Sequence, residues 1–138
     1  MPEERVVSER ELSELGEALG RRLASGAVVF LEGDLGAGKT TLARAIVRGL
    51  GAADAVSSPT YALVHHYHGH RGDIYHVDCY RLRSPDAAAD LDWEQLVNSE
   101  ALIIEWPERG GAWVPEPSVR VTLRHLDDDA SRRRMVVQ

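Results

Sequence analysis

The sequence predicts an α/β fold in three layers, with helices on both faces of a mixed central sheet. Two short apolar runs, residues 27–31 and 101–104, have the composition of buried central strands. Segments with helical spacing of apolar residues precede and follow the first run. A glycine-containing turn later in the chain joins two more strands as a hairpin, so the sheet should contain antiparallel strands as well.

The N-terminal helix is predicted from Ser8 and Glu11, which have the spacing of a capping box. Leucines then recur at helical spacing from Leu12 to Leu23 and give this helix one apolar face. Gly26 is the expected stop. The first buried strand follows directly.

A second helix and a hairpin are expected in the middle of the chain. The helix should cover residues 39–50, where leucine, isoleucine and valine share one face. Strands are expected at residues 61–68 and 73–78, with residues 69–72 as the turn between them.

The C-terminal part is expected to contain one helix and three strands. The helix is predicted over residues 85–96. The buried strand at 101–104 then ends in an acid, and residues 119–124 alternate as a half-exposed strand does. Residues 134–137 should pair with that strand across an acidic turn.

The loop between the first buried strand and the second helix, from Gly33 to Thr40, matches the pattern G-x-x-x-x-G-K-[ST]. Its three glycines let the backbone bring N–H groups against phosphate oxygens, and the following helix directs its positive end at the same anion. Lys39 would reach the β- and γ-phosphates, and the Thr40 hydroxyl would bind Mg²⁺. The expected fold is therefore P-loop NTPase-like. The nucleotide-binding residues expected here are Asp34, Leu35, Gly36, Ala37, Gly38, Lys39, Thr40 and Thr41.

Two carboxylates follow strands and are candidates to hold Mg²⁺ or its water, together with Thr40. Glu105 follows two isoleucines, which is the pattern of a Walker B element, and Asp78 ends the strand at 73–78. P-loop sites place such an acid at the C-terminal end of a strand. We therefore expect Lys39, Asp78 and Glu105 to be the catalytic residues.

The phosphate loop alone does not name the reaction, since several classes of protein share it. Guanine recognition through an Asn-Lys-x-Asp element is excluded, because Lys39 is the single lysine among 16 basic residues. ATP is therefore the expected nucleotide. A small-molecule kinase remains an alternative, with Arg81 and Arg83 as candidates for an arginine-bearing lid. A slowly turning nucleotide-gated binding module is a second alternative.

Composition limits the compartment and the partners. The 138 residues suit one domain, spanning residues 1–138. A net charge of −6 is poorly suited to gripping nucleic acid directly. One cysteine, no signal-peptide pattern and no apolar run long enough for a membrane span predict a cytoplasmic protein without membrane contact.

Four ordered blocks resemble the signature motifs of the TsaE (YjeE) family: GDLGAGKTT at 33–41, SPTY at 58–61, HVDCYRL at 76–82 and IEWPE at 104–108. The resemblance runs over nearly the whole chain. It implies an ATPase that acts with the TsaB and TsaD proteins to install threonylcarbamoyl on adenosine 37 of tRNA. In this scheme the tRNA meets the ATPase only indirectly, through the protein complex.

The resemblance also implies roles for particular residues. Thr40 and Glu105 would hold Mg²⁺, and Asp78 would lie behind the metal or orient water. Thr60 would lie in a switch-like loop that senses the γ-phosphate, and Arg132 falls near a family arginine close to the nucleotide. Independently of the resemblance, no arginine in the sequence stands out as an arginine finger, and Arg81 and Arg109 are the candidates.

Other aromatic and imidazole groups are less informative in sequence. Trp106 would lie at the mouth of the site or pack in the core. His76 is interpreted as a structural strand histidine. The histidines of the hairpin are interpreted as surface groups rather than a zinc site, because no cysteine or carboxylate stands at ligand spacing.

Overall fold

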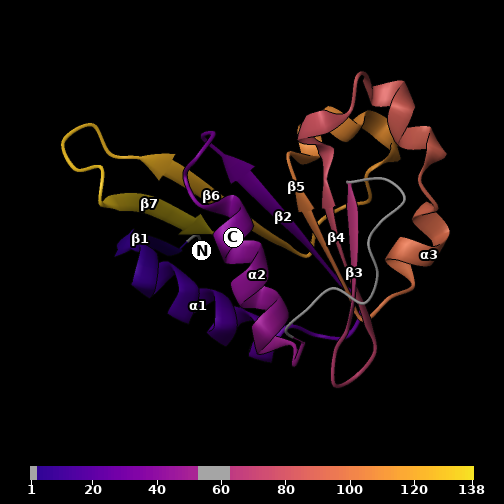
Figure 1. The fold of residues 1–138 in the computed structure, drawn as a ribbon, viewed down its shortest axis with the longest axis horizontal. Coiled ribbons are helices and arrows are strands. Elements are labelled where there is room, and N and C mark those ends of the chain that lie inside the picture. The colour runs from indigo at the N-terminus through magenta and orange to yellow at the C-terminus, as the bar shows by residue number, and fades with distance from the viewer. Residues whose placement is uncertain (1–2, 53–62) are drawn as a thin grey trace.

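The computed structural model describes residues 3–52 and 63–138, and it contains one seven-stranded mixed sheet (Figure 1). The strand order is β1-β7-β6-β2-β5-β4-β3. Three pairs are parallel (β2 with β5 and with β6, and β4 with β5), and three are antiparallel (β1 with β7, β6 with β7, and β3 with β4). The strands are β1 (Glu3–Ser8), β2 (Ala27–Gly33), β3 (Val64–His68), β4 (Asp73–Asp78), β5 (Ala101–Glu105), β6 (Val119–His125) and β7 (Arg132–Val137).

Helices lie on both faces of the sheet, so the predicted three-layer arrangement is confirmed. The helices α1 (Glu9–Arg22) and α2 (Lys39–Gly49) lie side by side on one face. The short α3 (Trp93–Val97) and three 3-10 segments, η1 (Cys79–Arg81), η2 (Pro85–Asp90) and η3 (Pro107–Trp113), belong to the other side.

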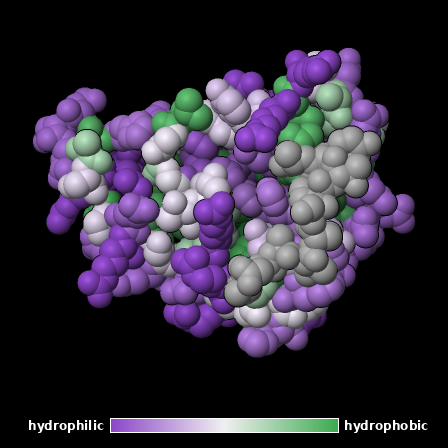
Figure 2. All heavy atoms as spheres, in the orientation of Figure 1, coloured by the Kyte–Doolittle hydropathy of each residue, from purple (hydrophilic) through white to green (hydrophobic). Residues whose placement is uncertain are grey.

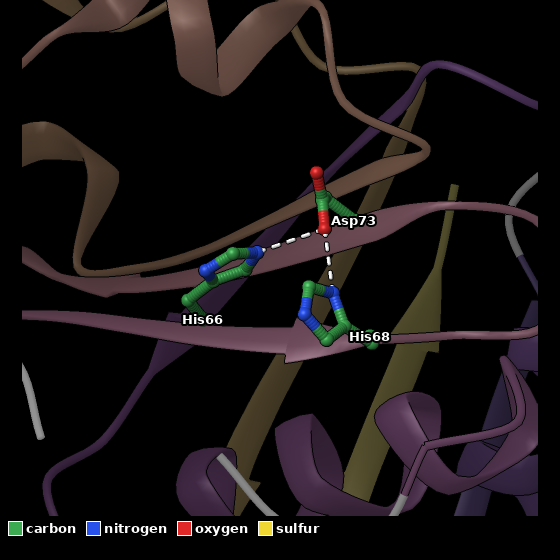
Figure 3. A group of neighbouring side chains, drawn as sticks. All are labelled: His66, His68 and Asp73. Atoms are coloured by element: carbon green, nitrogen blue, oxygen red, sulfur yellow. Dashed lines mark hydrogen bonds and ion pairs between the residues drawn. The ribbon is translucent and has the colours of Figure 1, made fainter. Parts of the chain in front are cut away.

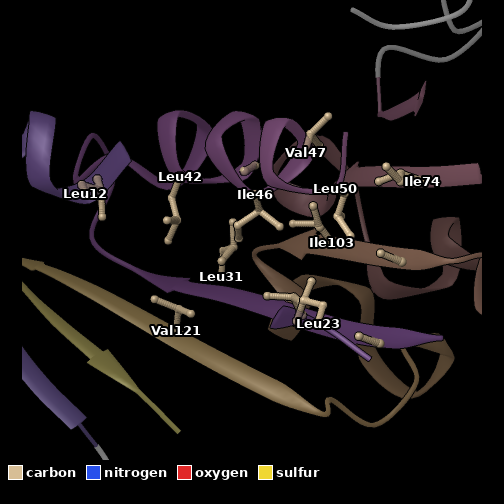
Figure 4. Packing of buried hydrophobic residues seen from close by; sticks show 14 of the residues in the cluster. Leu12, Leu23, Leu31, Leu42, Ile46, Val47, Leu50, Ile74, Ile103 and Val121 are labelled. Atoms are coloured by element: carbon tan, nitrogen blue, oxygen red, sulfur yellow. The ribbon is translucent and has the colours of Figure 1, made fainter. Parts of the chain in front are cut away.

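The strand residues divide between two hydrophobic cores because successive side chains of a strand point to opposite faces. On the α1–α2 side, Leu31 and Ile103 pack with Leu42 and Ile46 of α2 (Figure 4). On the α3 side, Phe30 and its alternating neighbours pack beneath the 3-10 segments. This double burial explains why β2 and β5 are continuous apolar runs in the sequence.

The two long helices cross through small residues. A Cβ atom added at Gly20 of α1 would lie 2.3 Å from the Ile46 carbonyl oxygen. One added at Gly49 of α2 would lie 2.2 Å from the Glu17 carbonyl oxygen. The helix backbones are therefore in direct contact, and this contact fixes the position of α2 over the sheet.

We expect Gly20→Ala to destabilise the fold by about 1–2 kcal/mol. Alanine gains roughly 1 kcal/mol of helix propensity over glycine, but overpacking a tight contact costs about 1–3 kcal/mol. The neighbour at 2.3 Å is backbone and cannot turn away, so the clash should dominate. The free energy of unfolding in urea checks this, with the exposed Arg21→Ala of the same helix as control. A variant as stable as the parent would contradict the backbone contact.

Several sequence expectations need correction. The helix expected over 85–96 is broken into η2 and α3, and Asp92 caps α3 by accepting from the Gln95 N–H at 3.1 Å. The N-terminal helix ends at Arg22 rather than near Gly26. The strand β1 was not expected, and it pairs with β7 at the sheet edge. Its exposed side chains mask the alternation that would have revealed it.

The remaining expected elements are confirmed in the described residues, except that the strand expected at 61–68 is observed from Val64 on; its first two residues and the SPTY block at 58–61 lie outside the described residues. Ser8 and Glu11 form the capping box, and the β3–β4 and β6–β7 pairs form as antiparallel partners. No helix in residues 3–52 and 63–138 has the length and apolar character needed to cross a bilayer. On the face drawn in Figure 2, apolar side chains are scattered among hydrophilic ones.

Candidate functional site

The glycine-rich turn between β2 and α2 has the backbone shape that the motif predicts. Gly33 has φ +122°, and a Cβ atom there would lie 1.9 Å from the Leu123 carbonyl oxygen, so only glycine fits. Gly38 has φ +109° and is the N-cap of α2. Because glycine has no side chain to cap the helix, the N–H groups of the first turn remain available to an anion.

The turn is fastened to the end of β6. The Asp34 carboxylate accepts from the His125 N–H at 2.9 Å and from Arg124 Nη1 at 3.1 Å. The backbone N–H of His125 foremost, and also Arg124, lower the pKa of Asp34, while burial opposes that shift. His125 Nε2 also lies 2.8 Å from the Leu35 carbonyl oxygen. The Asp34 side chain therefore holds the loop in place rather than facing a ligand.

Lys39 is 4% exposed and its ammonium group lies inside the turn. Nζ donates to the carbonyl oxygens of Asp34 at 2.6 Å and Gly33 at 3.1 Å, and it lies 4.2 Å from the centre of the Trp106 ring. Burial lowers the pKa of Lys39, while nearby carboxylates, Glu105 foremost, oppose that shift. A phosphate at this place would favour the charged amine further.

Glu105 ends β5 and its carboxylate is the centre of a small polar cluster. The Thr40 hydroxyl of α2 donates to Oε1 at 3.1 Å and Oε2 at 3.2 Å. His76 of β4, which is 4% exposed, places Nε2 at 2.6 Å from Oε2. Burial raises the pKa of Glu105, but the His76 contact, Thr40 and Lys39 together outweigh it, so the pKa is lowered. The carboxylate is therefore held ionised and fixed.

Asp78 lies next to this cluster because of the strand register. Asp78 of β4 and Leu31 of β2 are the partners of Glu105 on either side, so the carboxyl ends of three parallel strands meet here. The Asp78 Oδ1 atom also accepts from the Tyr80 N–H at 3.0 Å. Open α/β sheets bind ligands at this edge.

A pocket of about 320 Å³ opens at this place, between the phosphate loop and the ends of β4 and β5. Its wall contains the predicted catalytic residues Lys39, Asp78 and Glu105. The lining residues are Leu35, Gly36, Gly38, Lys39, Thr40, Thr41, Asp78, Tyr80, Glu105 and Trp106.

Trp106 has a backbone conformation that is rare for a large side chain, with φ +56° and ψ +50°. Its ring lines the pocket, beneath Lys39 and 4.9 Å from the centre of the Tyr80 ring. The Arg109 guanidinium lies 4.4 Å from the Tyr80 ring centre and donates to the Tyr80 carbonyl oxygen at 3.2 Å. Cation and ring stacking thus form one rim of the pocket.

Two predicted site residues remain, Thr60 and Arg132. Thr60 lies outside the described residues. Arg132 is exposed, and its charge contributes to lowering the pKa of Glu11 and of Asp129. Its neighbour Arg133 lies against the phosphate loop, since a Cβ atom added at Gly38 would meet Arg133 Nη1 at 2.9 Å.

Neither the contact of His76 with Glu105 nor the place of Arg133 beside the phosphate loop was predicted from the sequence. Both positions depend on strand register. His76 lies two residues before Asp78, the direct partner of Glu105, and Arg133 pairs with His125 at the end of β6. A one-residue shift along a strand moves a side chain to the other face, and three arginines in a row give no signal for choosing between them.

Known proteins resemble this chain in fold and in sequence. The solved structure described as "Crystal structure of Bacillus subtilus YdiB" matches with a TM-score of 0.78 and 22% identity, and the match covers 99% of this chain and 84% of that one. The likeness shows a P-loop fold. Proteins named tRNA threonylcarbamoyladenosine biosynthesis protein TsaE match more closely in sequence. The one from Treponema pallidum (strain Nichols) is 38% identical over 122 residues, which is 88% of this chain and 90% of the relative.

A second such relative, from Haemophilus influenzae, is 41% identical over 102 residues, which is 73% of this chain and 65% of that protein. A family model described as "Threonylcarbamoyl adenosine biosynthesis protein TsaE" matches residues 6–135. Family and fold together indicate a nucleotide-binding role. The chain belongs to the TsaE family, and its place is in the biosynthesis of threonylcarbamoyladenosine in tRNA.

Proposed function

We propose that the protein binds ATP with Mg²⁺ in the pocket at the phosphate loop and hydrolyses it during tRNA threonylcarbamoyladenosine formation. One observation carries this proposal: Lys39, Thr40 and Glu105 converge at the carboxyl ends of parallel strands, directly beside the uncapped start of α2. That combination provides a cation, a hydroxyl and a carboxylate next to a ready anion site.

The donor set fits the proposed ligands. A hydroxyl and an ionised carboxylate about 3 Å apart are hard oxygen ligands of the kind Mg²⁺ takes, and Mg²⁺ keeps waters beside one or two protein ligands. Asp78 in the same wall can hold one of those waters. The phosphates would take the first-turn N–H groups of α2, with Lys39 and Arg133 as the nearby cations.

Each residue has a distinct task in phosphoryl transfer, which depends on position and charge. Bound Mg²⁺ supplies a positive charge that offsets the charge of the phosphates. Lys39 neutralises phosphate oxygens, and Thr40 and Glu105 fix the metal's position. His76 holds Glu105 in orientation as a partner behind the ligand. Asp78, in the pocket wall, would orient the attacking water.

The partners we propose are the TsaB and TsaD proteins, in the cytoplasm, with the whole chain acting as one ATPase domain. The net charge of −6 favours a protein partner over direct contact with tRNA. Tyr80, Trp106 and Arg109 form a partly exposed rim beside the pocket, where a docked protein could close over the nucleotide.

The test is ATP binding by calorimetry, with GTP as control, followed by phosphate release measured with and without TsaB and TsaD. Micromolar ATP binding and release that depends on the partners would support the proposal. ATP use that depends on a small acceptor would indicate a kinase, and tight ATP binding without release in either condition would indicate a nucleotide gate.

We expect Glu105→Ala to weaken Mg²⁺-ATP binding by at least about tenfold, and metal-free ATP binding much less. The change removes the carboxylate that Thr40 and His76 hold in place. Calorimetry with Mg²⁺ and with a chelator separates the two forms, and Glu94→Ala is the control because Glu94 is exposed on α3 and does not line the pocket. Equal losses with and without metal would show that Glu105 is only a structural acid.

A further inference from the structure

A second polar cluster lies on the β3–β4 hairpin, apart from the nucleotide pocket. Asp73 Oδ1 is 2.9 Å from His66 Nε2 and 2.8 Å from His68 Nδ1 (Figure 3). The three ligand atoms all lie within 4.8 Å of one another. Both imidazole nitrogens point at this one carboxylate oxygen, so three potential ligand atoms are gathered in a small space.

The hairpin register creates this arrangement. His66 and His68 are two residues apart on β3, so they share one face of the sheet. Asp73 is the direct partner of His68 across the turn and the diagonal neighbour of His66. The sequence predicted no carboxylate at ligand spacing from these histidines. The structure corrects this expectation, because Asp73 of the neighbouring strand lies next to both.

The cluster is partly fixed before any ligand binds. The His66 side chain is 27% exposed, and its ring stacks on Tyr75 with centroids 4.5 Å apart and planes 15° apart. The Asp73 carboxylate lies within hydrogen-bond distance of both rings, so its position relative to the two histidines is fixed as well.

We propose that His66, His68 and Asp73 form a binding site for a divalent transition-metal ion of the zinc class. Imidazole favours Zn²⁺, Co²⁺, Ni²⁺ and Cu²⁺ over Mg²⁺ and Ca²⁺, which take oxygen ligands. Three protein ligands on one open face leave a coordination position for water, because the His68 side chain is 64% exposed. The bound ion would join β3, the edge strand of the sheet, to β4.

This site is separate from the one proposed for Mg²⁺-ATP. Asp73 begins β4 and Asp78 ends it, so the two sites lie about 16 Å apart at the usual rise of a strand. The residues also face opposite sides of the sheet: Tyr75, beneath His66, belongs to the α3-side core, while Glu105 faces α2. Metal binding on the hairpin should leave nucleotide affinity unchanged.

The experiment is calorimetric titration of the untagged protein with Zn²⁺ in excess Mg²⁺, and visible spectroscopy with Co²⁺ as a probe of ligand geometry. We expect one strong site, and a rise in melting temperature with Zn²⁺. His68→Ala and Asp73→Asn should each weaken Zn²⁺ binding by at least about 10- to 100-fold. Losing a group that only orients a metal ligand already costs that much, and each of these variants removes a ligand itself.

Two controls make the result specific. His70→Ala removes an exposed histidine of the same hairpin outside the cluster and should leave Zn²⁺ affinity unchanged. Glu105→Ala should also keep it. ATP affinity reports whether the three hairpin variants remain folded, and the melting temperature without added metal does so for Glu105→Ala. No Zn²⁺ binding, or Zn²⁺ binding that survives in His68→Ala and Asp73→Asn or is lost in Glu105→Ala, would overturn the proposal.

Discussion

Replacing Lys39 with methionine should lower ATP affinity by at least about 100-fold while the protein stays folded. Methionine keeps much of the buried stem of Lys39 and removes the amine, which lies within the turn where the phosphates would bind. No arginine can take over this place, because a guanidinium is planar and larger than an ammonium. Calorimetry with Mg²⁺-ATP measures the loss.

The folded state should tolerate this change because Lys39 does not belong to either hydrophobic core. Burial lowers the pKa of Lys39, so the charged amine opposes folding at neutral pH. The folded state therefore loses this proton at a lower pH than the unfolded chain does, and the free energy of unfolding rises as the pH passes through the pKa of Lys39 in the folded state. The wild type should therefore gain stability over Lys39→Met towards alkaline pH, and urea unfolding across that range measures the difference.

The matched control is Arg44→Met, which removes an exposed cation from the same helix. It should change ATP affinity little, because surface charges act weakly at a distance in salt. If Lys39→Met bound ATP as the wild type does, the phosphate loop would not be the nucleotide site.

The fold was predictable where one local pattern decides the structure. The apolar runs of β2 and β5 are buried on both faces, and the motif between β2 and α2 restricts its own backbone through Gly33 and Gly38. The strand β1 was not predictable, because Glu3 and its exposed neighbours carry no apolar alternation and pair with a strand at the other end of the chain.

The candidate site shows the same division. Lys39 and Thr40 follow from the motif, and Glu105 and Asp78 follow from their places at strand ends. The partner of Glu105 could not be read from the sequence, because His76 reaches it only through the parallel pairing of β4 with β5. Side-chain clusters that join different strands depend on the register of strand pairing, and that register cannot be read from a single sequence.

The second large effect expected is an increase in the rate of ATP hydrolysis when TsaB and TsaD are present. A charged group supplied by a partner can accelerate phosphoryl transfer by about 10³–10⁵-fold. Within the described residues, the pocket wall contains the cation Lys39 and the acids Asp78 and Glu105 but no arginine, and Arg133 lies against the phosphate loop at Gly38 rather than in this wall. The isolated protein should therefore be slow.

The chain has an arginine near the pocket, Arg109, but its guanidinium is held away from the proposed phosphate site. Its guanidinium stacks over Tyr80 and lies 5.6 Å from the Trp106 ring centre, so it is held at the rim of the pocket. A docked protein could release Arg109 towards the phosphates or supply its own cation. Arg109→Ala in the presence of the partners distinguishes these routes: a large loss of rate indicates the first, and an unchanged rate the second.

The decisive measurement is phosphate release at saturating ATP while the TsaB–TsaD assembly is titrated. The rate should rise with the concentration of the assembly and then reach a plateau. ATP is already saturating, so the plateau marks the point at which every molecule of the protein has a partner that orders its site. The Lys39→Met variant should stay inactive at every concentration, which excludes ATPase activity brought in with the partners. A fast isolated enzyme that ignores the assembly would instead mean that this pocket closes over its nucleotide without help.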